Sequence, residues 1–375
     1  MKSVYITGTG LFTPEQSISN AELVAAFNSW AENWNQQQAV AIEAGEVNAQ
    51  ALSSVEFIEK ASGIKSRYVM DKQGILDPER MKPYLPERPN EQPCIQAEMA
   101  VQAAEQALQQ AGLQGEQIDL VILACSNPQR AYPAVAIEVQ QLLGAGGFAY
   151  DMNVACSSAT FGIQAACNAI QSGQAQRVLM VNPEICSAHL NFCDRDSHFI
   201  FGDACTAVIL ESAEVASSTQ GAFEVFASKL MTSFSNNIRN NAGFLNRCDE
   251  AGLGQRDKLF MQEGRKVFKE VCPLVAEMIS DQLAAHHVQV ADVDRLWLHQ
   301  ANLNMNQLIA RRVLGRDASA KEAPVILDRY ANTSSAGSII AFHLHRDDLQ
   351  AGAHGVICSF GAGYSAGCLL VRKVS

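Results

Sequence analysis

Positive charge and long apolar runs are both scarce in this chain. Lysine and arginine number 28 against 39 aspartate and glutamate residues, which gives a formal net charge of −11. Such an acidic chain is a poor match for nucleic acid or for an anionic membrane surface. No stretch approaches the ~18 apolar residues that a membrane-spanning helix needs, and the first apolar run is too short for a secretion signal. We therefore expect a cytoplasmic protein that binds neither nucleic acid nor membrane.

Cysteine patterns typical of metal sites and disulfide frameworks are also missing. The eleven cysteines include no C-x-x-C pair and no cluster with histidines. An odd number of cysteines in a long chain without an export signal indicates reduced thiols, and the sequence predicts no metal site. By contrast, 48% of the residues are hydrophobic and only 18% are charged. This balance indicates a large buried core.

What the chain does contain is an internal repeat. Residues 118–125 (IDLVILAC) resemble residues 293–300 (VDRLWLHQ), and residues 154–158 (VACSS) match residues 330–334 (YANTS) at an offset of 176. Each copy reads as strand, connection, strand, helix and strand, which predicts mainly parallel sheets covered by helices. We expect a duplicated α/β chain with an N-terminal half, residues 1–216, and a C-terminal half, residues 217–375.

Periodicity places one amphipathic helix in each half, over residues 96–112 and 267–285. Three further segments stand outside the repeat. Residues 28–54 are predicted to be an inserted helical pair, and the proline-rich residues 71–93 a surface excursion. The polar residues 233–257 are a candidate cover for a site.

Cys156 is the strongest candidate nucleophile, because it stands where a strand is expected to turn into a helix. Free backbone N–H groups and the positive end of the helix dipole would lower the pKa of a thiol there. The small neighbours of Cys156, in the sequence VACSSA, would let an acyl group come close. The alternative is a buried thiol at a helix start.

The repeat makes His299 and Asn332 candidate site residues. Taken alone, His299 fits a satisfied core histidine at a strand end, and Asn332 fits an ordinary helix cap. However, Asn332 is the internal counterpart of Cys156 at the offset of 176. Two equivalent helix starts should converge between the halves, and His299 follows a strand of the second half. A Cys, a His and an Asn at one place suit acyl chemistry better than metal binding.

A glycine-rich turn, Phe360-Gly361-Ala362-Gly363-Tyr364, follows the last apolar strand that we expect. Its backbone can approach a substrate closely and offer N–H groups to an oxyanion. The turn could also cradle a phosphate, but it lacks the G-x-G-x-x-G pattern of nucleotide-binding loops.

Together these motifs resemble the β-ketoacyl-acyl-carrier-protein synthases of type III. The resemblance covers nearly the whole chain and rests on the Cys156 segment, HQAN at 299–302, NTS at 332–334 and FGAG at 360–363, all in family order. GIKSR at 63–67, FGD at 201–203 and VFK at 267–269 also match. The resemblance implies a thiolase-like fold, in which two strand/helix halves form a layered α-β-α-β-α core.

The resemblance also implies the reaction. Cys156 would accept the acyl group from an acyl thioester such as acyl-CoA. His299 and Asn332 would donate hydrogen bonds to the malonyl thioester on acyl carrier protein, which loses carbon dioxide. The N–H groups of Cys156 and Ala362 would hold the second oxyanion. The product would be a 3-oxoacyl-acyl carrier protein for fatty-acid biosynthesis, with no cofactor beyond the thioester substrates.

Further residues are implied to bind substrate. Tyr132 matches an aromatic residue that enters the partner subunit's acyl pocket, which implies a homodimer. Asn304 stands where a basic residue usually helps to dock the carrier protein, so docking would rest on Arg265, Lys266 and Lys269 or on Arg311, Arg312 and Arg316. Phe57 and Ala61 replace a Trp and an Arg near the adenine in relatives. The substrate-binding set is Tyr132, Arg195, Arg265, Lys269, Phe360, Gly361 and Phe57.

Three alternatives remain. A degradative thiolase would need a second cysteine where Ser359 stands, and Cys358 should point the opposite way on a regular strand. A non-catalytic partner subunit would typically lack the nucleophile. An acyltransferase or a condensing enzyme of specialised metabolism would keep all three polar residues, so the sequence leaves that possibility open.

Overall fold

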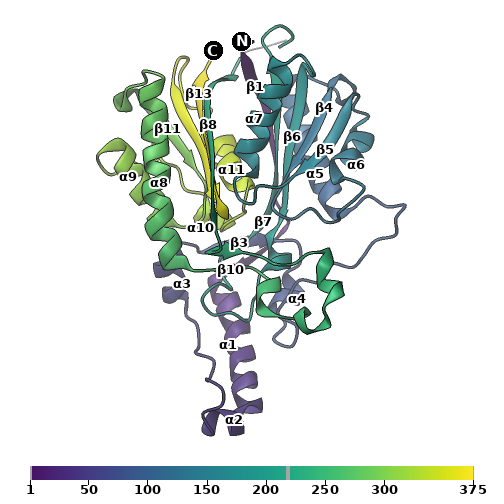
Figure 1. The fold of residues 1–375 in the computed structure, drawn as a ribbon, viewed down its shortest axis with the longest axis vertical. Coiled ribbons are helices and arrows are strands. Elements are labelled where there is room, and N and C mark those ends of the chain that lie inside the picture. The colour runs from purple at the N-terminus through teal and green to yellow at the C-terminus, as the bar shows by residue number, and fades with distance from the viewer. Residues whose placement is uncertain (1, 217–219, 375) are drawn as a thin grey trace.

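The computed structural model describes residues 2–216 and 220–374, which build a nine-stranded sheet with helices on both faces (Figure 1). The strand order is β11-β12-β13-β8-β1-β7-β6-β4-β5. The strands are β1 (Val4–Phe12), β4 (Leu120–Ala124), β5 (Phe148–Met152), β6 (Arg177–Ile185), β7 (Asp203–Ser212), β8 (Phe223–Ser235), β11 (Val293–Leu298), β12 (His354–Gly361) and β13 (Gly363–Lys373). Two short ribbons lie outside the sheet: β2 (Gln16–Ser19) with β3 (Ser66–Val69), and β9 (Ile238–Arg239) with β10 (Met261–Gln262).

The sheet repeats one topology twice. The run β1-β7-β6-β4 is ordered like β8-β13-β12-β11, and in each run two antiparallel pairs are followed by a parallel pair. The expectation of mainly parallel sheets is wrong, because only β4–β5, β4–β6 and β11–β12 pair in parallel. Parallel neighbours need a long crossover, whereas Ala362 alone separates β12 from β13. The predicted boundary between the halves adjoins residues 217–219, which are outside the described residues.

Helices form three layers around the two halves of the sheet, as Figure 1 shows. Helices α7 (Ser158–Gln171) and α11 (Ala336–Leu344) lie in a central apolar cluster drawn from both halves. Helices α5 (Ile95–Ala111) and α6 (Val135–Leu143) cover the outer face of the first half. Helices α8 (Gly264–Ala285) and α9 (Leu303–Leu314) cover the outer face of the second. The layered α-β-α-β-α core of the thiolase-like fold is therefore confirmed.

Both predicted amphipathic helices form, with small shifts at their ends. Helix α5 is followed by Gly112 in the left-handed conformation, at φ 68°. Its alanine face lets β1 come very close: a methyl group at Gly10 would fall 1.9 Å from the carbonyl oxygen of Ala103. Helix α8 begins at Gly264, slightly before the predicted start.

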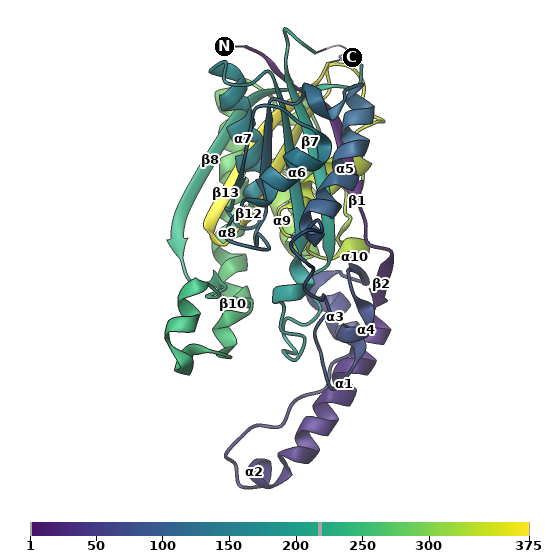
Figure 2. The same ribbon diagram turned by 90° about the vertical axis from the view of Figure 1, so that its right-hand side faces the viewer.

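The inserted segments leave the body to different extents. Helices α1 (Asn20–Gln37) and α2 (Ala39–Glu43) project from one end of the molecule (Figure 2). The predicted helical pair is therefore present, but its first helix begins earlier, at a capping box formed by Ser19 and Glu22. Residues 71–93 include the short α4 (Lys72–Leu76) and bury Ile75 and Met81, so they are only partly a surface excursion.

The remaining helices, α3 (Val55–Ser62) and α10 (Leu327–Tyr330), lie near the end of the sheet from which α1 projects. In the described part of the chain, no helix combines the length and apolar character that a membrane crossing requires.

Candidate active site

Cys156 lies on a tight turn between β5 and α7. The N–H of Ser157 bonds the carbonyl of Val154 at 3.0 Å, and the N–H of Ser158 bonds the carbonyl of Ala155 at 3.1 Å. Ala155 takes a positive φ of 47°, a conformation that is strained for any residue with a side chain. The turn thus presents the half-buried Cys156 between the strand and the helix.

The glycine turn closes over this cysteine. A methyl group at Gly361 would lie 2.6 Å from Cβ and 3.1 Å from Sγ of Cys156. No side chain therefore fits at position 361 without displacing Cys156. The N–H of Ala362, the next residue, faces the sulfur together with the N–H of Cys156 itself.

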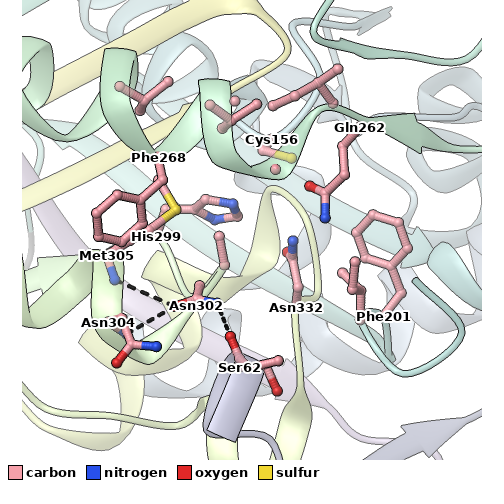
Figure 3. Close-up of a pocket in the computed structure, with 18 of the residues that line it drawn as sticks. Ser62, Cys156, Phe201, Gln262, Phe268, His299, Asn302, Asn304, Met305 and Asn332 are labelled. Atoms are coloured by element: carbon pink, nitrogen blue, oxygen red, sulfur yellow. Dashed lines mark hydrogen bonds between the residues drawn. The ribbon is translucent and has the colours of Figure 1, made fainter. Parts of the chain in front are cut away.

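The second half of the chain supplies His299 and Asn332. His299 follows β11, is 2% exposed, and packs its ring against the edge of Phe360 at 5.2 Å between centroids. Its buried Nδ1 has no hydrogen-bond partner among the described residues. The Oδ1 atom of Asn332 accepts a hydrogen bond from the N–H of Ser334 at 2.9 Å. This bond turns the amide NH₂ of Asn332 toward the cavity (Figure 3).

The two helix starts meet at this point. The Ser334 hydroxyl, just before α11, donates to Sγ of Cys156 at 3.4 Å. Ala331 takes a positive φ of 55°, as Ala155 does at the matching place of the first half. The structure thus brings the counterparts Cys156 and Asn332 to one place between the halves.

Burial sets the charge of the resting site. It raises the pKa of the Cys156 thiol to about 11, although the Ser334 hydroxyl and the N–H groups of Cys156 and Ala362 oppose the rise. The expected lowering of this pKa is therefore wrong, because desolvation by burial outweighs the hydrogen bonds that favour the thiolate. The N–H groups of Ser157 and Ser158 bond the carbonyls of Val154 and Ala155 instead. Burial also lowers the pKa of His299 to about 4. Thiol and imidazole are both neutral near pH 7.

Two cavities share Cys156. The first, of about 690 Å³, is lined by Cys156, His299 and Asn332 together (Figure 3). The second, of about 640 Å³, is lined by the Cys156 turn, Ser334, residues 362–365 and part of the segment 232–242. Phe201, Ile238 and Phe260 line both cavities. Within the described ranges, no group of three or more His, Cys, Asp or Glu side chains is arranged to hold a metal ion.

The candidate substrate-binding residues divide into two groups. Phe57, Arg265, Phe360 and Gly361 line the first cavity, together with Ala61 and Asn304. Arg195, Lys269 and Tyr132 line neither cavity. The Arg195 guanidinium stacks on the Phe57 ring at 3.9 Å and donates to the carbonyl of Leu52 at 2.7 Å. Tyr132 is 85% exposed.

Several lining residues were not found from the sequence. Ser334 belongs to the NTS motif and could have been assigned from its place two residues after Asn332. Phe201 belongs to the FGD motif, and the backbone of its segment bonds Asn332 on both sides, through Ile200 at 2.9 Å and Gly202 at 3.1 Å. Phe260 and Gln262 reach the cavity through the ribbon β9–β10, and no sequence signal marks them.

The fold and the site define a condensing enzyme of the acyltransferase type. Family models described as 3-oxoacyl-[acyl-carrier-protein] synthase III and its C-terminal region match residues 150–232 and 283–373. The β-ketodecanoyl-[acyl-carrier-protein] synthase of Pseudomonas aeruginosa is 67% identical over 93% of this chain and 99% of its own. The β-ketoacyl-[acyl-carrier-protein] synthase III of Granulibacter bethesdensis is 27% identical over 99% of this chain and 100% of its own.

Solved structures agree on the fold. The 3-oxoacyl-(acyl carrier protein) synthase III of Pseudomonas aeruginosa has a TM-score of 0.76 at 22% identity, covering 100% of this chain and 99% of that one. The priming β-ketosynthase of the R1128 polyketide pathway has a TM-score of 0.77 at 22% identity, covering 100% and 97%. The chain belongs to the 3-oxoacyl-[acyl-carrier-protein] synthase III family.

A degradative thiolase would need a second cysteine just before the glycine turn, where this chain has Ser359. Ser359 points inward and its hydroxyl lies 2.9 Å from that of Ser338 on α11. Cys358 points to the opposite face, into the outer apolar cluster beneath α8. The expected alternation of these two side chains is confirmed.

The raised pKa of Cys156 has a measurable consequence. Because only the thiolate reacts, the rate of alkylation by iodoacetamide should rise about tenfold for each pH unit from pH 7 to 10, with no plateau near an ordinary thiol pKa. The rate is measured by intact mass, with Cys156→Ser as the control for the other cysteines. A plateau below pH 8 would contradict a buried, neutral thiol.

Proposed function

We propose that this enzyme condenses a medium-chain acyl-CoA with malonyl-acyl carrier protein. The products are carbon dioxide, coenzyme A and a 3-oxoacyl-acyl carrier protein for fatty-acid biosynthesis. The observation that carries the proposal is the single cavity lined by Cys156, His299 and Asn332. Membership of the family supports it. A cytoplasmic location belongs to the proposal, since all eleven cysteines are free.

In the first step, the sulfur of Cys156 attacks the acyl thioester carbonyl. The bond to coenzyme A breaks, and the leaving sulfur takes up the thiol proton. The N–H groups of Cys156 and Ala362, which face the sulfur, would stabilise the oxyanion of this step. Because these donors belong to the backbone, alanine at position 362 can fill the role.

In the second step, the malonyl thioester loses carbon dioxide and becomes an enolate. The Asn332 amide, fixed by its bond to Ser334, and the neutral His299 ring would donate to the enolate oxygen. Fixed neutral donors stabilise a charge that develops only in the transition state. The enolate carbon then attacks the carbonyl of acyl-Cys156, the C–S bond breaks, and the released sulfur takes up a proton from solvent to restore the thiol. No cofactor enters this scheme.

The proposed primer has eight carbons. The name of the Pseudomonas aeruginosa relative at 67% identity specifies a ten-carbon ketoacyl product, and condensation with malonyl adds two carbons. The second cavity, of about 640 Å³ with Val154, Phe234 and Ile238 in its lining, supports a chain much longer than acetyl.

We also propose a homodimer built on the β5 edge of the sheet. Four apolar or aromatic residues near this edge are between 42% and 85% exposed: Tyr132, Ile137, Leu142 and Phe148. The first precedes α6, the next two lie in α6, and Phe148 begins the edge strand β5. Pairing of edge strands would cover them and would bring Tyr132 toward the partner's acyl cavity. A molecular mass of one chain by light scattering would contradict this arrangement.

The carrier protein is proposed to dock beside the start of α8. Arg265 lines the first cavity, and Lys269 lies one helical turn further along. In the alternative cluster, Arg311 pairs with Asp317 at 2.5 Å and Arg316 pairs with Glu322. These pairs neutralise much of that cluster locally. In the α8 cluster Lys266 pairs with Glu263 at 3.6 Å, but Arg265 and Lys269 are in no ion pair among the described residues, so α8 offers the freer positive charge to an acidic partner.

The primer can be identified by intact-mass analysis after incubation with acyl-CoA esters of two to sixteen carbons. Octanoyl-CoA should give the fastest mono-acylation, and Cys156→Ser should give none. Addition of malonyl-acyl carrier protein should then discharge the adduct with release of carbon dioxide. Discharge to an alcohol or amine without carbon dioxide would favour an acyltransferase instead.

The roles of His299 and Asn332 can be separated from that of Cys156. His299→Ala and Asn332→Ala should still form the acyl-enzyme, but condensation should fall by about 10²–10³-fold, the usual cost of one oxyanion donor. Acylation is followed by mass and decarboxylation by labelled carbon dioxide. A variant that decarboxylates normally but fails to acylate would reverse the assignment.

Docking at α8 predicts a salt-sensitive effect. Lys269→Glu should raise the KM for malonyl-acyl carrier protein several-fold at low salt and leave alkylation of Cys156 unchanged. The effect should shrink above ~0.1 M salt, where the Debye length falls below about 10 Å. Arg312→Glu, in the alternative cluster, is the matched control; equal effects of the two reversals would argue against docking at α8.

A further inference from the structure

Three side chains form a closed hydrogen-bonded ring behind the glycine turn. The Tyr364 hydroxyl donates to Oε2 of Glu270 at 2.7 Å and accepts from the Asn237 amide at 2.7 Å. The same amide donates to Oε2 of Glu270 at 3.1 Å. We refer to Tyr364, Glu270 and Asn237 as the clasp.

The clasp joins three elements that are far apart in the sequence. Tyr364 lies in β13, two residues after Ala362 of the glycine turn. Glu270 lies in α8, and Asn237 connects β8 to β9. The carbonyl of Asn237 also accepts the N–H of Glu263, just after β10, at 2.8 Å. The clasp therefore fixes the base of the ribbon β9–β10.

This ribbon covers the reactive cysteine. Ile238 of β9 lines both cavities, and Gln262 of β10 lines the first. Figure 3 shows the Gln262 side chain directed toward the space between Cys156 and Asn332. A second attachment lies just before β10, where the N–H of Phe260 bonds the carbonyl of His189 at 2.9 Å. The clasp is the attachment on the side of the glycine turn.

The chemistry of the clasp suits a device that holds a segment in position rather than one that supports the core. Tyr364 is 7% exposed and its ring lines the second cavity, whereas Glu270 is exposed and Asn237 half-buried. Loss of the hydroxyl would leave the carboxylate and the amide accessible to water, so neither would be stranded in an apolar interior. Such a loss should loosen the ribbon and leave the fold intact.

We propose that the clasp holds the ribbon closed over acyl-Cys156 and so keeps water away from the thioester. The proposal rests on the proposed function, because it needs an acyl-enzyme. Attack by water would form a C–O bond and break the C–S bond, releasing the free fatty acid and returning a proton to the thiol. Each such event would waste one primer. Tyr364 is thus a positioning residue that acts through the ribbon.

Tyr364→Phe tests this by removing only the hydroxyl. The octanoyl-Cys156 adduct, isolated without malonyl-acyl carrier protein, should hydrolyse about tenfold faster, the factor that one hydrogen bond to a charged group is typically worth. Amide hydrogen exchange should accelerate in residues 236–263 and stay unchanged in α5. A general loss of stability would instead raise exchange throughout the chain.

Matched variants separate the clasp from a local packing effect. Glu270→Gln keeps an acceptor for the hydroxyl and should retain most of the adduct lifetime, whereas Glu270→Ala should behave like Tyr364→Phe. Asn241→Ala removes a 2.7 Å bond to Asp257 in the same segment but outside the clasp, and should leave the lifetime unchanged.

The outcomes distinguish the two proposals. A parent enzyme that forms no acyl-Cys156 overturns the proposed function, and the role of the clasp falls with it. A parent that forms a stable adduct, with a Tyr364→Phe variant of the same lifetime and the same exchange in the ribbon, overturns the clasp alone.

Discussion

The site depends on a buried carboxyl that joins the two halves beside the turn that carries Cys156. Glu184 of β6 is 1% exposed and accepts hydrogen bonds from both N–H and hydroxyl of Ser126 in the first half and of Ser335 in the second. Ser335 directly precedes α11, whose apolar face packs with α7 in the central cluster. Because a buried carboxyl without these donors would be costly, the start of α11 is held beside β6. Ser334 then reaches Cys156, and Asn332 enters the same cavity.

The site lies between two packed halves, and its electrostatics follow from the burial of its polar groups. Burial raises the pKa of Cys156 and lowers the pKa of His299, so the resting site carries no net charge from either group. This disfavours a standing thiolate. It favours donors that are neutral and already oriented, because such donors gain most when a negative charge appears on a substrate oxygen in a water-poor cavity. In such a site, an acyl thioester on Cys156 would last longer if water were kept away from it.

The sequence predicted the meeting of Cys156 and Asn332 because a repeat fixes equivalent positions, and equivalent helix starts face one another across a pseudo-axis. It failed on the pKa of Cys156, since a strand-to-helix position does not reveal how deeply the thiol is desolvated, nor that the N–H groups of Ser157 and Ser158 bond carbonyls of their own turn. It also failed on strand direction, because antiparallel neighbours such as β6 and β7, or β12 and β13 with only Ala362 between them, leave no repeat motif that marks their direction. Phe260 and Gln262 belong to no sequence motif. They line the cavity only because the folded chain brings β10 and the residue before it back beside Cys156.

Cys156 lines both cavities, and the ribbon β9–β10 also contributes to both. The ribbon β9–β10 contributes Ile238 to each cavity, while His299 and Asn332 line only the first. If the second cavity holds the acyl chain, as proposed, the length of that chain would be set on surfaces that His299 and Asn332 do not form. Sequence changes in residues 232–242 would then alter the accepted primer without moving His299 or Asn332. One arrangement of Cys156, His299 and Asn332, held by the packing of α7 with α11 in the central cluster, would in that case be compatible with different acyl chains.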